Sequence, residues 1–435
     1  MVTVQILTQT QLSPDEARDL IPRSALDHNT VVDAAAELVD DVRRNGESAL
    51  RQHAERFDGG APEHLRVPRE RFEQALSELD SDLRAAIDIA IARVRSGSAA
   101  QVPAPTRTQI APGAVIDQHW VPVERVGLYV PGGKAVYPSS VIMNVVAAQA
   151  AGVESIALVS PPQRDHGGSV HPTILAVASI LGVDEVYAIG GAGAIGALAY
   201  GVPELGLRSV QVISGPGNMF VAAAKRVVSG IVGIDSEAGP TEILIIADDS
   251  ADPDFVAADL ISQAEHDEAA SAVLITDSEE FAHAVNERID VRVATTGHSE
   301  RVRVALSGDQ SRILVVPNLD VAMTLSDAYG AEHLEIHTRD AAVRAGLVKH
   351  AGAIFVGSYT PVSLGDYLAG SNHVLPTHGH ARHSAALGAY TFLRPRQTVM
   401  YTEAALAEVA DSIVTFAQAE NLPAHGDAVT ARSRK

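Results

Sequence analysis

The chain has 435 residues, of which 46% are hydrophobic, so it is long and apolar enough for a globular protein of two or more domains. Its net charge of −21 argues against DNA, RNA or an anionic membrane as a partner, because these polyanions bind basic surfaces. The absence of cysteine excludes disulfides, thiolate zinc sites and a cysteine nucleophile, so any metal needs His, Asp, Glu, Gln or backbone ligands. The N-terminus lacks a signal-peptide core and the apolar runs are too short to span a bilayer, so we expect a cytoplasmic protein.

The N-terminal quarter of the chain is predicted to be largely helical. Ser13 and Glu16 have the spacing of a capping box, which predicts a short helix. Residues 30–58 carry an apolar stripe at helical spacing and are interrupted at Asn45-Gly46, which predicts two helices. Residues 69–96 have a helical pattern that ends at Ser96-Gly97.

The middle of the chain alternates between short apolar strands and helical patterns. The predicted strands are 126–130, 155–160, 185–189, 210–214, 243–247, 272–276, 313–316 and 353–356, with helices at 139–151, 170–181 and 193–200 among them. Short buried strands that alternate with helices predict parallel sheets covered on both faces. Because eight or more strands are too many for one sheet, we expect two α/β halves. After them, Thr402 is placed to cap a last amphipathic helix that Asn421 and Pro423 end.

Three glycine-rich turns follow predicted strands, at residues 129–134, 189–196 and 214–218. The second contains Gly191-x-Gly193-x-x-Gly196, which is the spelling of the dinucleotide fingerprint. The fingerprint also requires an acid about 20 residues further on, and that region, Ile213-Ser214-Gly215, has none. Each turn alone is also compatible with a tight connection. Together they indicate a crevice at the carboxyl ends of parallel strands, where a nucleotide binds by a route other than the standard fingerprint.

Two polar groups are candidates for chemistry. Gln263 and His266 are three residues apart near the end of a predicted helix, so both can reach one metal ion, although an exposed last turn has the same pattern. Glu332 and His333 place a carboxylate beside an imidazole, which suits proton transfer near neutral pH, and a solvated strand edge is the alternative.

Later polar residues have simpler alternatives. Asp366 lies in a turn-like context where Asp often caps a helix, and His373 lies in an aperiodic polar loop. These two, with His425, nevertheless complete a set that favours a metal-assisted enzyme over a binding module.

The order of these motifs resembles the histidinol dehydrogenase family over roughly residues 30 to 426. The matching strings are Gly127-Leu-Tyr-Val-Pro-Gly-Gly133, Gly190-Gly-Ala192 with Ala194-Ile195, Gly215-Pro-Gly-Asn218, Ala238-Gly-Pro-Thr-Glu242, Gln263-Ala-Glu-His266, Glu332-His-Leu-Glu335, Gly365-Asp-Tyr367, Ser371-Asn-His-Val-Leu-Pro-Thr377, and Glu420-Asn-Leu with His425. The resemblance implies the last step of histidine biosynthesis, the four-electron oxidation of L-histidinol to L-histidine through L-histidinaldehyde with two NAD.

The resemblance also implies one zinc ion per subunit and an intertwined homodimer whose sites are shared between subunits. The implied zinc ligands are Gln263, His266, Asp366 and, from the other subunit, His425. These ligands and the catalytic pair would line the substrate site, together with three further contacts at Thr241, His373 and Glu420. The family often has Ser where this chain has Thr241, and Thr keeps the hydroxyl group.

The family pattern assigns a role to each catalytic residue. His333 would take the alcohol proton while hydride leaves for NAD, and Glu332 would activate water for attack on the aldehyde. The implied NAD contacts are Tyr129, Asn218 and a Gln whose position is Gly193 here. This departure creates the apparent fingerprint and removes a side-chain contact. We therefore expect weaker NAD binding, with a lower NAD Michaelis constant after Gly193→Gln.

We thus expect an α/β fold with two Rossmann-like, incompletely doubly wound domains and small, mostly helical terminal segments. The expected parts are an N-terminal helical segment at 1–28, a first α/β domain with the metal and catalytic residues at 29–128 and 242–384, a second on the NAD side at 129–241, and a helical tail that reaches the partner subunit at 385–435. Two alternatives are a related zinc- and NAD-dependent dehydrogenase of another polar alcohol, and a zinc hydrolase that binds no nucleotide. A third is a metal-binding protein without activity.

Overall fold

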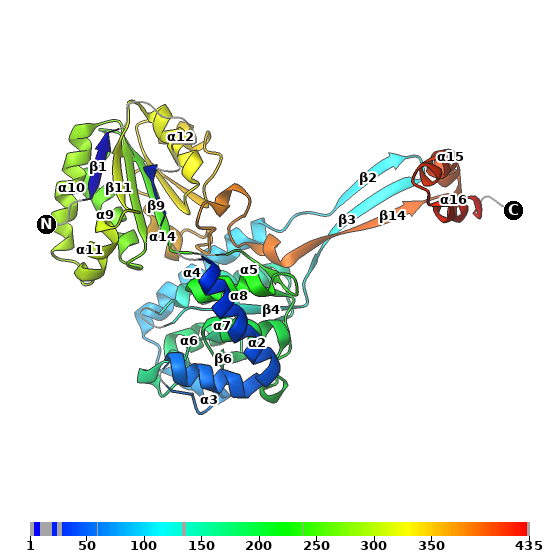
Figure 1. The fold of residues 1–435 in the computed structure, drawn as a ribbon, viewed down its shortest axis with the longest axis horizontal. Helices are drawn as coiled ribbons and strands as arrows, with labels where there is room; N and C mark the ends of the chain where they lie inside the picture. Colours follow the sequence, from blue (N-terminus) through cyan, green and yellow to red (C-terminus); the bar gives the residue numbers. More distant parts are fainter. Residues whose placement is uncertain are drawn as a thin grey trace.

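The computed structural model describes residues 4–8, 20–23, 28–58, 60–132, 136–237 and 239–432. These residues form two α/β lobes, each built on a parallel sheet, and a long arm that projects away from both lobes and ends in two helices (Figure 1). We name the lobes by their central strands, the β4 lobe and the β9 lobe. The fold is α/β with parallel sheets, as predicted.

The β4 lobe holds a five-stranded parallel sheet in the order β6-β5-β4-β7-β8. The chain starts at β4, winds outward through β5 and β6, and returns to the other side of β4 for β7 and β8. The direction of winding therefore reverses between β4 and β7, which is the doubly wound arrangement with a switch point. The strands are β4 Arg125–Tyr129, β5 Ser155–Ser160, β6 Val186–Ala188, β7 Val212–Ser214 and β8 Gly233–Ile234.

The β9 lobe repeats this winding. Its sheet has the order β1-β11-β10-β9-β12-β13 and is parallel throughout, with the switch point between β9 and β12. The strands are β9 Glu242–Ala247, β10 Ser271–Thr276, β11 Arg312–Val315, β12 His333–His337 and β13 Ala353–Val356, with β1 Gln5–Thr8 added at the outer edge.

Helices cover both faces of each sheet because alternate strand residues point to opposite faces. On β9, Ile243 and Ile245 belong to one apolar cluster and Leu244 and Ile246 to another. In the β9 lobe the helices are α9 Pro253–Ala264, α10 Glu279–Val293, α11 Ser299–Ser307, α12 Leu319–Tyr329, α13 Ala341–Ala345 and α14 Val362–Tyr367. In the β4 lobe they are α2 His28–His53, α3 Arg69–Ser77, α4 Ser81–Ala100, α5 Pro138–Ala151, α6 Pro172–Ile180, α7 Gly191–Tyr200 and α8 Met219–Val228.

The N-terminal helices belong to the β4 lobe, so the expected grouping of 29–128 with 242–384 is wrong. Helix α2 packs on α7 and α8, α3 packs on α6, and α4 packs on α5. The reason lies in α7, which is rich in Gly and Ala and lets α2 approach closely. A Cβ atom on Gly196 would lie 3.2 Å from the Cα atom of Val39.

The arm is a three-stranded antiparallel sheet in the order β14-β3-β2, capped by two helices at its far end (Figure 1). Its elements are β2 Thr106–Ala111, β3 Ala114–Pro122, β14 Leu393–Tyr401, α15 Glu403–Ala419 and α16 Pro423–Thr430. Thr402 caps α15 as predicted, since its hydroxyl accepts a hydrogen bond from the Ala405 amide. The arm was not predicted: residues 385–435 were expected to be helical, and β14 is a strand.

The N-terminal segment also differs from its expectation where it is described. Gln5–Thr8 is a strand and not a helix, because it pairs in parallel with β11. The predicted capping box of Ser13 and Glu16 lies outside the described residues. The predicted break at Gly46 is present inside α2, where that glycine has φ 52°.

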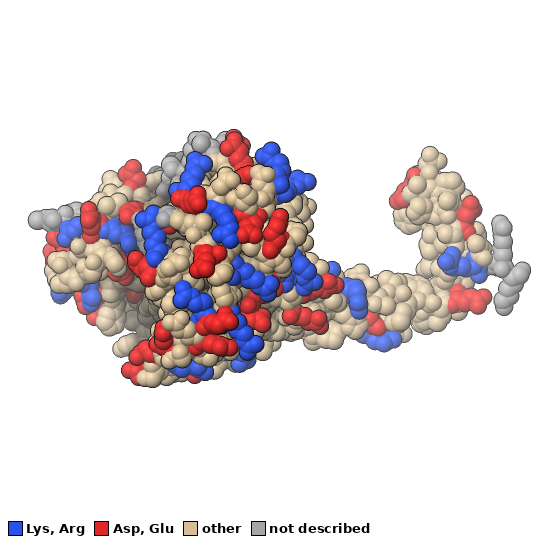
Figure 2. Space-filling view, turned by 90° about the horizontal axis from the view of Figure 1, so that it is seen from below, with Lys and Arg blue, Asp and Glu red and all other residues tan. Residues whose placement is uncertain are grey.

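The surface offers no large region of one charge on the face drawn in Figure 2, where acidic and basic side chains are interspersed over the lobes. Among the described helices, none is long and apolar enough to cross a membrane.

Candidate active site

Glu332 and His333 lie at the amino end of β12, beside the start of β9. In the register of the two strands, His333 is paired with Ile243. Strand β12 runs between β9 and β13, and the two residues are only 7% and 4% exposed. The alternative of a solvated strand edge is therefore wrong.

The backbone of Glu242 holds both of these side chains. Its N–H donates to Glu332 Oε2 at 2.8 Å, and its carbonyl lies 3.0 Å from His333 Nδ1. Since a carbonyl can only accept, His333 Nδ1 carries the proton and Nε2 carries the lone pair. Nε2 is buried and has no hydrogen-bond partner in the described part of the chain. The imidazole thus presents a free basic atom, which a proton-accepting role requires.

Glu332 is held by a second donor and titrates near neutrality. The Thr241 hydroxyl donates to Glu332 Oε2 at 2.5 Å. Burial raises the pKa of the Glu332 carboxyl to about 7, against the opposing effects of His333 and of the bond from Thr241. The hydrogen bonds from Thr241 and from the Glu242 amide both fall on Oε2, so Oε1 is the atom with capacity left to bind water.

The amide of Gln263 is oriented by the same Thr241 hydroxyl. Gln263 lies in the last turn of α9, is 1% exposed, and donates from Nε2 to Thr241 Oγ1 at 2.6 Å. Because Thr241 uses its own proton on Glu332, it accepts from Gln263, and this fixes which end of the amide is oxygen. Gln263 Oε1 is buried and lacks a partner among the described residues.

His266, Asp366 and His373 gather near this pair of atoms. His266 follows the end of α9, and its amide still bonds the Gln263 carbonyl at 3.3 Å. Burial lowers the pKa of the His266 imidazole, and the charges of Asp366 and His333 act on it as well. Burial also lowers the pKa of His373, on which Asp366, His333 and His266 act. Residues from α9, α14, β12 and the loop after α14 thus form one cluster.

His373 is hydrogen-bonded to residues of both lobes. Its Nδ1 lies 3.0 Å from the Asp366 carbonyl and its Nε2 lies 3.1 Å from the hydroxyl of Ser140, on α5 of the β4 lobe. Nδ1 therefore carries the proton and Nε2 accepts from Ser140. Both ring nitrogens are engaged, so a contact of His373 with a substrate requires exchange of the Ser140 bond.

Glu420 and His425 lie apart from the cluster. Glu420 ends α15 and His425 lies in α16, both exposed at the far end of the arm (Figure 1). The structure of one chain does not bring these two residues to Gln263, His266 or Asp366.

The three glycine-rich turns follow the carboxyl ends of β4, β6 and β7, and those after β4 and β7 lie at the switch point of the β4 lobe. Tyr129 ends β4 and Ser214 ends the adjacent β7. Gly215 has φ 119°, and a Cβ atom there would lie 2.0 Å from the Tyr129 carbonyl oxygen, so only glycine fits. The Tyr129 hydroxyl accepts from the Gly191 amide at 3.3 Å, while Asn218 caps α8. Gly133 and Lys134 of the first turn lie outside the described residues.

Gly193 faces α2. The Cβ atom that it lacks would lie 2.7 Å from Nδ1 of His53, whose Nε2 is 3.0 Å from Asp41 Oδ2. His53 Nδ1 is buried without a partner in the described chain. The His53 imidazole therefore occupies the space that the Cβ atom of any other residue at position 193 would need.

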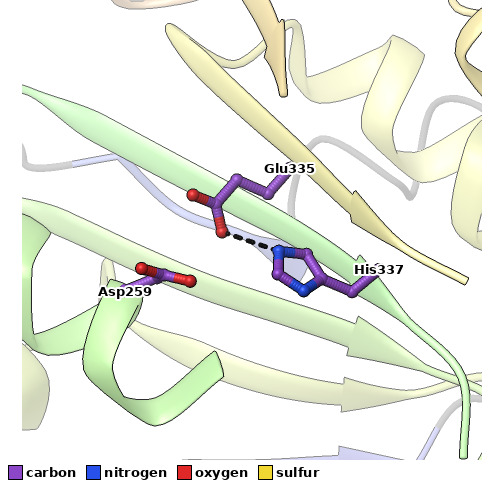
Figure 3. A group of neighbouring side chains, drawn as sticks. All are labelled: Asp259, Glu335 and His337. Atoms are coloured by element: carbon purple, nitrogen blue, oxygen red, sulfur yellow. Dashed lines mark hydrogen bonds and ion pairs between the residues drawn. The ribbon is translucent and has the colours of Figure 1, made fainter. Parts of the chain in front are cut away.

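A second polar cluster lies further along β12, where Glu335 and His337 face Asp259 of α9 (Figure 3). Glu335 Oε1 accepts from the Val362 amide at 2.8 Å, and its Oε2 lies 3.2 Å from His337 Nε2. Burial and the adjacent Glu335 raise the pKa of the Asp259 carboxyl to about 8. A proton on Asp259 lets it lie beside the Glu335 carboxylate, so that one proton is shared between the two groups.

Comparison with known proteins identifies the family. The family profile described as histidinol dehydrogenase matches residues 21–433. A histidinol dehydrogenase from Leifsonia xyli subsp. xyli is 61% identical over 413 residues, covering 95% of this chain and 95% of the relative. The chain belongs to the histidinol dehydrogenase family. It is therefore an oxidoreductase of histidine biosynthesis, and the hydrolase and inactive metal-binding alternatives are excluded.

Further members of the histidinol dehydrogenase family agree in sequence and in fold. A histidinol dehydrogenase from Mycolicibacterium smegmatis is 55% identical, covering 97% of this chain and 95% of the relative. The crystal structure of histidinol dehydrogenase from Elizabethkingia anophelis has a TM-score of 0.91 at 31% identity, covering 99% of this chain and 98% of that chain.

Sequence reasoning gave no role to Glu242 or Ser140. Glu242 acts through its backbone, which no side-chain pattern reveals, although it ends the motif Gly239-Pro-Thr-Glu242. Ser140 had no signal, since a serine near the start of a predicted helix is common.

Proposed function

We propose that this chain oxidises L-histidinol to L-histidine through L-histidinaldehyde, transferring two hydrides to two molecules of NAD and consuming one water. The observation that carries the proposal is a pair of buried atoms to which no described residue is hydrogen-bonded, His333 Nε2 and Gln263 Oε1, in one cluster at the amino ends of β9 and β12. One atom is a base and the other is a neutral oxygen ligand, so the site combines proton transfer with cation binding.

The donor set fits a zinc ion. Gln263 Oε1 is oriented by Thr241, and His266 and Asp366 add an imidazole and a carboxylate from the same cluster. Nitrogen and oxygen donors of this kind are common zinc ligands, with amide oxygen a less usual one. Zinc held there supplies a Lewis acid that orients the nitrogen atoms of the substrate.

We further propose that the fourth ligand, His425, and the substrate contact Glu420 come from a second copy of the chain. The tip of the arm that carries them exposes apolar side chains: Phe416 is 69% exposed and Leu422 is 43% exposed. Exposed apolar groups of this size favour a protein interface. In a two-fold dimer the contact is reciprocal, so each arm would complete the other site.

The β4 lobe fits NAD at its switch point, between Tyr129 and the turn from Ser214 to Asn218. The close approach of Gly215 to Tyr129 holds this turn against the end of β4. The positive end of the α8 dipole lies at the turn and favours phosphate, while the Asn218 side chain accepts from the amides of Phe220 and Val221. Our proposed NAD contacts are therefore Tyr129, Asn218 and the backbone at Gly193.

In the first oxidation, His333 Nε2 accepts the proton of the alcohol as hydride leaves the carbon atom. The hydrogen bond from Nδ1 to the Glu242 carbonyl fixes the tautomer in which Nε2 is the acceptor, and it stabilises the imidazolium that forms. Burial excludes competing water from this atom.

In the second oxidation, Glu332 takes a proton from the water that attacks the aldehyde. Oε2 is anchored by Thr241 and the Glu242 amide, which leaves Oε1 for the water. His333 assists again as hydride leaves. We keep Thr241 as a substrate-site residue through its hold on Gln263 and Glu332, and His373 as a contact made when its Ser140 bond is exchanged.

The decisive experiment counts NADH formed per L-histidinol consumed by the purified, zinc-loaded chain. Two NADH with histidine as product support the proposal. One NADH with accumulated aldehyde would contradict the second step, and no NADH from a folded, zinc-containing protein would reject the substrate. Chelation should abolish activity and added zinc should restore it, with zinc content measured in parallel.

A further inference from the structure

A series of buried hydrogen bonds links the loop that carries His373, after α14 of the β9 lobe, to the turn at Gly215, after β7 of the β4 lobe. It begins at His373, whose Nε2 accepts from Ser140 Oγ at 3.1 Å. Beside it, Asn372 donates from Nδ2 to the Met143 carbonyl at 2.9 Å, so the loop is fixed to α5 at two points. Ser140 is 1% exposed.

The series of hydrogen bonds continues along α5. Asn144 is fully buried and donates from Nδ2 to the Ser140 carbonyl at 2.8 Å. Its Oδ1 accepts from the Ser214 hydroxyl at 2.7 Å, at the end of β7. The amide of Asn144 therefore bridges the helix and the strand, and its oxygen and nitrogen are both assigned by their partners.

The series of hydrogen bonds ends at Gly215, where side chains bind both the backbone N–H and the backbone carbonyl. The Gly215 amide donates to Asp235 Oδ2 at 2.8 Å, and its carbonyl accepts from Lys225 Nζ at 3.1 Å. Lys225 and Asp235 also form a buried ion pair, and Ser214 Oγ lies 3.2 Å from Asp235. The conformation of this turn thus depends on Ser214, which the Asn144 side chain holds in place, and Asn144 is itself held by the backbone carbonyl of Ser140.

We infer that Ser140 and Asn144 are positioning residues that couple the His373 loop to the Gly215 turn. The inference rests on the proposed function, in which the loop faces the substrate and the turn faces NAD. A substrate that takes His373 Nε2 from Ser140 would perturb the first link, and the change would reach the turn through Asn144 and Ser214. Substrate and cofactor then alter each other's affinity, as any coupling between two sites requires.

The test is hydrogen–deuterium exchange on the full chain without ligands, comparing wild type with Ser140→Ala. Loss of one buried hydrogen bond should raise exchange about three- to tenfold in peptides from the His373 loop and also in peptides from residues 214–221. Ser139→Ala, on the same turn of α5, is the matched control and should change neither. Faster exchange at the loop alone, or at neither segment, would overturn the inference.

A second variant, Ser214→Ala, removes a hydrogen bond at the other end of the series, and it provides the test if Ser140→Ala does not fold. Ser214→Ala should raise exchange in the His373 loop, and the double variant should show less than the sum of both effects, because the two residues act through Asn144. Additive effects would overturn the inference. In kinetics, Ser140→Ala should raise the NAD Michaelis constant more than it lowers kcat, with Ser140→Thr restoring it.

Failure of the proposed function can be told apart from failure of this inference. The first shows as absence of NADH from histidinol with the wild-type protein, and it does not alter the exchange result.

Discussion

Gln263 Oε1 and His333 Nε2 are buried polar atoms that the described residues leave without partners. Such an atom costs about 1–3 kcal/mol, and native proteins keep few of them. Both lie in the cluster that the sequence motifs indicated, and both are oriented by a neighbour that is itself fixed, Thr241 for the amide and Glu242 for the imidazole. The orientation of these atoms is the part of the site that side-chain spacing could not predict.

His333→Asn and Glu332→Gln should separate the two oxidations. Removal of the base at His333 should slow oxidation of histidinol about 10²- to 10⁴-fold. Glu332→Gln should spare that step and slow oxidation of histidinaldehyde, because the amide cannot take a proton from water. Single-turnover NADH formation from each substrate measures the two steps. Equal damage to both steps by both variants would show that the division of roles is wrong.

The aldehyde step should depend on pH through Glu332. Its carboxyl group must be ionised to accept a proton, and burial raises its pKa to about 7. The rate of histidinaldehyde oxidation should therefore rise as the pH passes upward through about 7 and fall below it. Residual activity of Glu332→Gln should lack this inflection, and an unchanged profile in that variant would assign the titration to another group.

At the scale of helices and strands, periodicity predicted what is buried and missed what is exposed. The eight predicted strands begin and end within about two residues of their predicted positions, because continuous apolar runs have few alternatives. Strands β1, β8 and β12 of the two lobes were not among those predicted. Strands β2 and β14 were missed because nearly all their residues are exposed, so neither alternation nor an apolar run marks them. Helix α16 was missed because Asn421 and Pro423 indicated an end and not a turn between helices.

Helix α7 carries a testable consequence of Gly193. Gly193→Gln should lower stability by about 1–3 kcal/mol, because its Cβ atom meets His53 at 2.7 Å. The sequence alone predicted only a gain in NAD affinity. His53→Ala in the same chain should relieve the clash, and the double variant should then show the lower NAD Michaelis constant.

Urea unfolding and NAD kinetics of both variants test this prediction. Gly230→Gln is the matched control, since its Cβ atom has open space and should change neither quantity. A stable single variant would mean that His53 moves aside without cost.

The pair of Asp259 on α9 and Glu335 on β12 should make stability depend on pH. The pKa of Asp259 is raised from an ordinary value near 3.8 to about 8, so the folded chain holds a proton that the unfolded chain releases. This stabilisation is complete below about pH 4 and is lost as the pH rises through about 8. Asp259→Asn keeps a donor toward Glu335 at every pH and should flatten the decline.

Melting temperatures at pH 5 and pH 8 measure this effect. Glu280→Gln, at an exposed carboxylate on α10, is the control and should decline as the wild type does. A parallel decline in Asp259→Asn would contradict the shared proton.

At the scale of the molecule, the sequence predicted two α/β halves but could not assign the N-terminal helices to one of them. Amphipathic stripes predict that α2, α3 and α4 pack, and not on which sheet. The choice depends on fit, such as the approach of Val39 to Gly196, which becomes visible only in three dimensions. The arm could not be predicted for the same reason, because it depends on the pairing of β3 with β14, which are more than 270 residues apart in the sequence.

The separation of the arm tip from the lobes has a genetic consequence. If each site joins the lobes of one chain to the arm of another, two inactive proteins can complement each other. A mixed dimer of His333→Asn and His425→Ala has one site with both lesions and one site with neither. Random reassembly of equal amounts should therefore restore about a quarter of wild-type activity. Co-expression of the two variants in a histidine-requiring host should permit growth without histidine, while each variant alone should not.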